Sequence, residues 1–133
     1  MKQITGGVTA AKGYKAAATA AGIKYQDRTD MAMVYSEVPA IVAGTFTTNV
    51  FKAAPVIWDR NIVKNIGKAQ AVVVNSGIAN ACTGEEGELY CKKTADAAAD
   101  GRLAVVVFAE VLRVGQHGLE ELQWYDVYLH HLA

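Results

Sequence analysis

The stretch Ala71-Val72-Val73-Val74-Asn75-Ser76-Gly77-Ile78-Ala79-Asn80-Ala81-Cys82-Thr83-Gly84 decides the fold of this chain. A short apolar run bounded by turn residues is typical of a buried β-strand. Asn, Ser and Gly then supply short polar groups and unusual backbone angles, so the end of the strand can point amides and N–H groups at a ligand. The pattern predicts a strand that leads into a functional loop.

A helix is predicted directly after this loop, over Gly84–Asp100. Thr83 is a good N-cap residue, and Glu86 three residues on completes a capping box. Glu88 and Lys92 are expected to form an i,i+4 ion pair on the solvent side. Small residues share another face of this helix: Gly87, Cys91, Ala95 and Ala98. We expect that face to pack closely against a neighbour such as a sheet.

Two strands are predicted upstream, over Met31–Ser36 and Ala40–Thr48, joined across Glu37-Val38-Pro39 as a hairpin or an adjacent pair. Pro55 can open a short helix over Val56–Lys64, because a missing N–H costs nothing in the first turn. One apolar stripe on this helix is made of Ile57, Trp58, Ile62 and Val63. Trp58 is therefore interpreted as a core residue rather than a ligand-stacking one.

Three blocks of the sequence carry a resemblance to a known family. NSGIANACTG (75–84) resembles the NSGNANACTG signature of the ornithine acetyltransferases, the bifunctional glutamate and ornithine N-acetyltransferases of arginine biosynthesis. GGVTAAKGYKAAATAAGIK (6–24) is similar to the family's GGVTAPKGFKAAG segment, and VPAIVAGTFTTNVFKAAPV (38–56) to its VPAVAAGVFTTNRVKAAPV segment. Order and spacing agree as well.

The resemblance implies an α/β fold, the N-terminal part of a layered sandwich, with one short and one longer helix. Alanine content alone would favour a helix over residues 8–24, but the glycines interrupt it and the resemblance favours strand and loop. The likeness covers residues 1–100. In the divergent tail over residues 101–133 a strand-like apolar run survives, but Trp124–Ala133 match nothing in the family. A frameshift, a mispredicted gene end or a truncation would explain that tail.

The resemblance also implies a chemistry. Family members are cut between an Ala and a Thr, and the freed Thr carries acetyl from N-acetylornithine to glutamate; some also use acetyl-CoA. The STGVIG-like oxyanion turn is not found near residues 105–120, and the nucleophilic Thr would lie beyond residue 133. We therefore predict no catalytic residue, no resident cofactor and an N-terminal fragment that is inactive alone. The alternative is a non-catalytic assembly or binding module that pairs with a separately encoded remainder of the enzyme. The resemblance also implies a β chain of the same enzyme as a partner, in an α/β hetero-oligomer.

The candidate substrate-binding residues all belong to the predicted loop: Asn75, Ser76, Gly77, Asn80 and Thr83. Their competing interpretation is turn formation and helix capping, which is favoured for Thr83. Thr47, Thr48 and Asn49 could line the same cleft or satisfy local backbone. The Gly7–Gly13 segment lacks the GK[ST] ending of a phosphate loop.

Bulk properties exclude several classes of function. The formal net charge is zero, which argues against nucleic-acid or anionic-membrane partners. No apolar stretch reaches the length of a membrane span, and the first residues lack a signal-peptide pattern, so a cytoplasmic protein is expected. Cys82 and Cys91 are expected to be reduced thiols. No metal site is expected, and His130 and His131 are interpreted as solvent-exposed.

Overall fold

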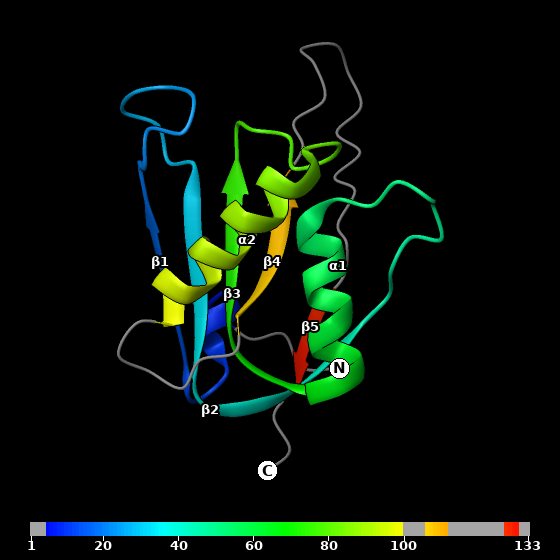
Figure 1. The fold of residues 1–133 in the computed structure, drawn as a ribbon. Coiled ribbons are helices and arrows are strands. Elements are labelled where there is room, and N and C mark those ends of the chain that lie inside the picture. The colour runs from blue at the N-terminus through cyan, green and yellow to red at the C-terminus, as the bar shows by residue number, and fades with distance from the viewer. Residues whose placement is uncertain (1–4, 100–105, 112–126, 131–133) are drawn as a thin grey trace.

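The structure is a computed structural model that describes residues 5–99 in full and the backbone of residues 106–111 and 127–130. Its elements follow one another along the chain as shown in Figure 1. In order they are η1 (Val8–Ala10), β1 (Tyr14–Thr19), β2 (Met31–Gly44), α1 (Ala54–Asn61), η2 (Ile62–Ile66), β3 (Lys68–Ser76), α2 (Gly84–Ala99), β4 (Val106–Val111) and β5 (Val127–His130). The predicted α/β class, with one short and one longer helix, is confirmed, and residues 8–24 form strand and loop around η1 and β1.

The strands form one mixed sheet in the order β1-β2-β3-β4, and β5 pairs with the end of β2. β1, β2 and β3 are antiparallel neighbours, whereas β3 and β4 are parallel. Parallel neighbours need a crossover connection, and α2 lies within that connection. Because β3 and β4 run in the same direction, their carboxyl ends meet at one edge of the sheet.

The prediction of two strands joined at Glu37-Val38-Pro39 is wrong, because β2 is a single strand from Met31 to Gly44. Its pairing with β3 shifts register between Tyr35 and Ala40. There the fully buried Ser36 hydroxyl donates a hydrogen bond of 2.7 Å to the carbonyl of Val38. A bulge leaves extra residues outside the ladder, which is where a proline without an N–H is tolerated in a sheet.

The short helix begins as predicted, with Pro55 in the first turn of α1. It continues as the π-helical segment η2 and ends where Gly67 adopts a φ of 68° and donates to the Ile62 carbonyl at 2.8 Å. Ile62 is buried and Trp58 packs into the core, as predicted. The apolar stripe is wrong for Ile57, which is 39% exposed.

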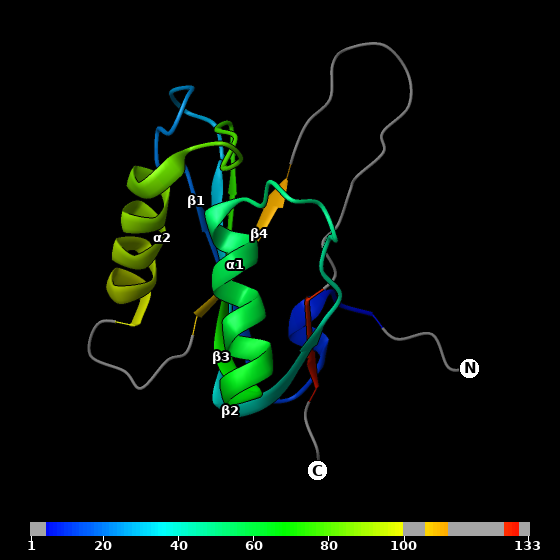
Figure 2. The same ribbon diagram turned by 45° about the vertical axis from the view of Figure 1, so that its right-hand side comes forward.

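Both helices cover the same face of the sheet (Figures 1 and 2). Ala71 and Val73 of β3 form a buried cluster with Ala95 of α2, and Trp58 of α1 packs against it. Trp58 also contacts a second cluster of Val42, Ile62 and Ala69. The small-residue face of α2 therefore packs on the sheet as predicted, because side chains without bulk allow close approach.

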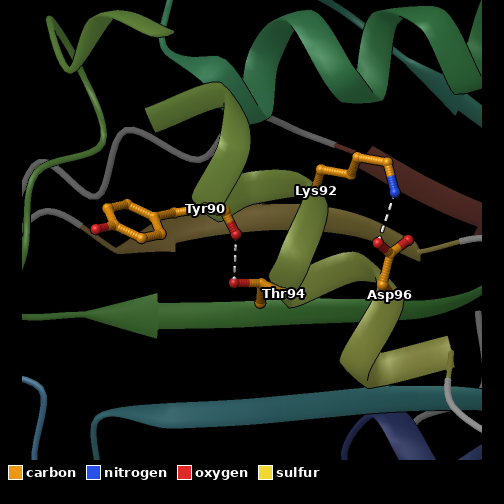
Figure 3. A network of polar contacts seen from close by, with 4 residues as sticks. All are labelled: Tyr90, Lys92, Thr94 and Asp96. Carbon is orange, nitrogen blue, oxygen red and sulfur yellow. Dashed lines mark hydrogen bonds and ion pairs between the residues drawn. The ribbon is translucent and has the colours of Figure 1, made fainter. Parts of the chain in front are cut away.

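The outer face of α2 carries polar contacts between successive turns (Figure 3). The ammonium of Lys92 lies 2.6 Å from the carboxylate of Asp96, so the predicted Glu88–Lys92 pair is wrong. Both acids are one turn from Lys92, and Glu88 lies instead beside a pocket at the start of the helix. The Thr94 hydroxyl donates to the Tyr90 carbonyl at 2.9 Å. Within the described residues, neither helix is long and apolar enough to cross a membrane.

Candidate functional site

The predicted loop leaves the sheet at the edge where β3 and β4 end. Asn75 and Ser76 are the last residues of β3, and they lie in register with Glu110 and Val111 at the end of β4. In open α/β sheets, ligands bind beyond the carboxyl ends of the strands. The fold therefore places the predicted loop at the edge where a ligand site is expected.

Hydrogen bonds bring three of the five candidate residues together. The Asn80 amide donates to the side-chain oxygen of Asn75 at 3.2 Å, and the Thr83 hydroxyl donates to the Asn80 carbonyl at 3.1 Å. Gly77 has a φ of 100°, a conformation that a side chain would strain. The loop thus has a defined shape although Gly77 and Thr83 are exposed.

Asp30 holds a second loop against this one, which sequence reasoning missed. Its carboxylate accepts N–H bonds of 2.7 Å from both Ala21 and Ile23, and its carbonyl accepts the Ser76 N–H at 2.9 Å. Asp30 is buried. A Cβ added at Gly77 would lie 3.2 Å from the Cβ of Lys24, so the two loops touch. The available signal was an Asp at a loop–strand junction, where carboxylates often bind nearby backbone.

The predicted capping box does not form among the described residues. The Thr83 hydroxyl is used by Asn80, and the Glu86 carboxylate accepts from the Tyr90 hydroxyl at 2.8 Å. A Cβ added at Gly87 would lie 1.8 Å from the Thr83 hydroxyl oxygen. Thr83 therefore lies over a position where only glycine leaves room, and its hydroxyl donates back to the loop.

Thr47 and Asn49 serve local backbone at the strand-to-helix connection before α1. The Thr47 hydroxyl accepts the Asn49 N–H at 3.1 Å, and the Asn49 side chain accepts the Phe51 N–H at 3.2 Å. The ammonium of Lys52 donates to the Asn49 carbonyl. These contacts agree with the interpretation in which Thr47 and Asn49 satisfy local backbone groups. They also hold the backbone that carries Val50 and Phe51.

An open pocket of about 250 Å³ lies between this connection and the start of α2. Its lining residues are Val50, Phe51, Lys52, Ala54, Ile57, Cys82, Thr83, Gly84 and Glu88. Thr83 is the one candidate residue that reaches it. No motif in the sequence indicates the other residues of this set, because they come from separate segments.

The two cysteines are free thiols, as predicted, and lie in different surroundings. Cys82 is exposed at the pocket with a φ of 59°. Cys91 is a buried residue of α2, and its pKa is raised to about 12. The largest cause is burial, and the nearby charges of Asp59 and Glu88 contribute less. A thiol held neutral in this way is a packing group.

Some predictions fall outside what is described. No cluster of three metal-ligating side chains occurs within residues 5–99. The interval near 105–120, where an oxyanion turn was sought, is only partly described, and His131 lies outside the described residues. For His130 only the backbone is described, in β5 opposite Ile41.

Comparison with known proteins identifies the family. A sequence model of the ArgJ family matches residues 15–111, from β1 through β4. The chain belongs to the ArgJ family. The resemblance to ornithine acetyltransferases that the three sequence blocks carried is thereby confirmed.

Curated relatives in this family include the arginine biosynthesis bifunctional protein ArgJ of Gloeobacter violaceus, which is 54% identical over 92 residues, or 69% of this chain and 23% of the relative. The Lactococcus lactis protein of the same name is 48% identical over 94 residues, covering 71% and 23%. The chloroplastic form of Oryza sativa subsp. japonica is 46% identical over 99 residues, covering 74% and 21%. The chain therefore spans about a quarter of the length of these curated relatives.

Solved structures agree with this assignment. The crystal structure of ArgJ from Bacillus halodurans matches with a TM-score of 0.73 at 35% identity, over 84% of this chain and 59% of that one. Ornithine acetyltransferase from Mycobacterium tuberculosis, solved in complex with ornithine, matches with a TM-score of 0.69 at 39% identity, over 83% and 61%. The ArgJ fold is thus shared over most of the chain.

Proposed function

We propose that this chain provides a substrate-contacting part of an acetyltransferase of arginine biosynthesis, which transfers acetyl from N-acetylornithine to glutamate. Family membership and the ornithine complex of a 39% identical relative support the proposal. The observation that carries it is the hydrogen-bonded loop from Asn75 to Thr83 at the carboxyl edge of β3 and β4. The residues proposed to touch substrate are Asn75, Ser76, Gly77, Asn80 and Thr83.

The chemistry of this loop suits polar, amino-acid-like substrates. Each Asn side chain offers both donors and an acceptor, so it can bind a carboxylate, an ammonium group or an amide carbonyl. Asp30 acts as a positioning residue that holds the backbone of Ser76 in place. Preorganised donors of this kind cost little reorganisation when a ligand binds.

The reacting groups are proposed to come from outside these 133 residues. The chain spans about a quarter of its curated relatives, so most of the relatives' residues have no counterpart in it. We propose that a β chain of the same enzyme supplies the nucleophilic Thr and that this chain alone does not turn over. A cytoplasmic location belongs to the same proposal.

The experiment compares acetyl transfer from N-acetylornithine to glutamate in two preparations. One contains the purified chain, and the other contains the chain co-expressed with the part of the Bacillus halodurans relative that it does not cover. We expect transfer in the co-expressed preparation alone. Asn75→Ala should lower that rate, whereas Asn65→Ala, at an exposed position of η2, should not. Turnover by the chain alone, or an equal effect of both variants, would contradict the proposal.

A second candidate function is a non-catalytic assembly module, and one face of the sheet favours it. Both helices lie on one face, where Ala71 and Val73 are buried (Figure 2). On the other face Ala18 of β1, Ala32 of β2 and Val74 of β3 lie directly opposite one another; Ala18 is exposed, and Ala32 and Val74 are half-buried. An apolar sheet face is normally covered by a second layer. Failure of the chain to co-purify with the remaining enzyme would eliminate this candidate.

A further inference from the structure

The pocket before α1 has an apolar wall that the structure leaves open to solvent. Val50 is 85% exposed and Phe51 is 81% exposed, and Ala54 and Ile57 line the same space. The bonds of Asn49 to the Phe51 N–H and the Lys52 ammonium fix the local backbone. The wall is therefore formed before any ligand arrives, and a ligand that covered it would gain from the removal of apolar surface from water.

Two opposite charges line the same pocket, Lys52 from the connection before α1 and Glu88 from α2. The Lys52 ammonium gives one hydrogen bond to Asn49 and keeps further donors for a ligand. Glu88 makes no ion pair within the part of the chain that the structure describes. The pocket thus combines one cation, one anion and an apolar wall between separate segments of the fold.

We propose that this pocket binds a free α-amino acid with an apolar side chain. The α-carboxylate would bind Lys52, the α-ammonium would bind Glu88, and the side chain would cover Val50 and Phe51. A charged side chain is disfavoured, because its terminal ammonium or carboxylate would lose water against the apolar wall without a partner. The pocket shares Thr83 with the candidate loop, but neither Asn75 nor Asn80 lines it, and amino-acid binding there does not depend on acetyl transfer.

The experiment is an NMR titration of the full chain with norleucine and with ornithine. These amino acids have side chains of equal length that end in a methyl group and an ammonium group respectively. We expect norleucine to bind about ten-fold more tightly, which corresponds to burial of one or two methylene groups. The largest amide shifts should fall at Phe51, Ala54 and Gly84. Equal or tighter binding of ornithine, shifts centred elsewhere, or no norleucine binding would overturn the proposal.

Matched variants test separately the contact of Glu88 with the ammonium group and the contact of Phe51 with the apolar side chain. Glu88→Gln should weaken norleucine about three- to five-fold, as expected for one exposed ion pair, and should leave N-acetylnorleucine, which has no ammonium, unaffected. Glu85→Gln on the same helix does not alter a lining residue and should leave norleucine affinity unchanged. Phe51→Ala should weaken both ligands. Equal effects of the two glutamate variants, or no effect of Phe51→Ala, would contradict the assignment.

Discussion

The loop around Cys82 and the helix–sheet contact around Cys91 are close in sequence but are held together by different forces. On the inner face of α2, Cys91 and Ala95 are buried, Ala95 against Ala71 and Val73 of the sheet, and packing sets the distance between layers. Around Cys82 the side chains are exposed, and polar groups bound to backbone atoms define the shape. Close packing of small side chains thus defines the core, whereas the exposed loop depends on specific hydrogen bonds that persist in contact with water.

The largest expected difference between the two regions is the reactivity of their thiols. Burial raises the pKa of Cys91 from 9.0 to about 12, so at pH 8 its thiolate fraction is about a thousand-fold lower than that of an unperturbed thiol. Iodoacetamide labelling followed by peptide mass spectrometry should modify Cys82 in the folded chain and both cysteines in urea. Because the folded state keeps the Cys91 proton to higher pH than the unfolded state, stability should fall as the pH rises above 9. Rapid labelling of Cys91 without urea would contradict the contrast.

Removal of the Asp30 carboxylate should cause the largest loss of stability in the loop region. Asp30→Ala leaves the N–H groups of Ala21 and Ile23 without their partner, at a cost of about 3 kcal/mol. Asp30→Asn keeps one acceptor oxygen and should lose about half as much. Urea unfolding gives both values. Asp27→Asn, at an exposed position of the same loop, is the control and should change stability by less than about 0.5 kcal/mol.

Much of the fold could be predicted because its signals are local. The β3 run, the loop after it and the small-residue face of α2 each need only neighbouring residues to be recognised. The continuity of β2 is not local, since Glu37-Val38-Pro39 has the composition of a turn. It remains a strand because both of its halves pair with β3 and its end pairs with β5. Tertiary pairing thus overrode a correct reading of local preference.

The candidate site likewise has a part that local sequence predicts and a part that only folding brings together. The Asn75–Thr83 loop was visible as one uninterrupted motif, and the structure joins Asn75, Asn80 and Thr83 by hydrogen bonds. Asp30 and Phe51 could not be assigned to it, because each reaches this edge of the sheet only through the antiparallel strands or the turn into α1. Residues that come together only when the chain folds show no characteristic spacing in the sequence.

The core region can be tested by adding volume to it. Ala95→Leu places three further carbon atoms between α2 and the cluster of Ala71 and Val73, and such overpacking costs about 2 kcal/mol. Ala97→Leu makes the same chemical change on the exposed face of α2 and should alter stability by less than about 0.5 kcal/mol. The comparison uses urea unfolding of both variants. Equal effects at the two positions would show that the face of α2 does not decide packing.

Gly87 joins the two regions, because it lies in α2 while Thr83 of the loop covers it. Gly87→Ala should gain about 1 kcal/mol from helix propensity, but its Cβ would lie 1.8 Å from the Thr83 hydroxyl oxygen. We expect the gain to be cancelled and the Asn80 contact to be disturbed. In a Thr83→Gly background the hydroxyl oxygen is absent, and so is the Thr83 Cβ, which would lie 2.5 Å from the new Cβ, so the same change should stabilise the chain. A double-mutant cycle by urea unfolding measures this coupling, and a full gain with Thr83 intact would mean that loop and helix are independent.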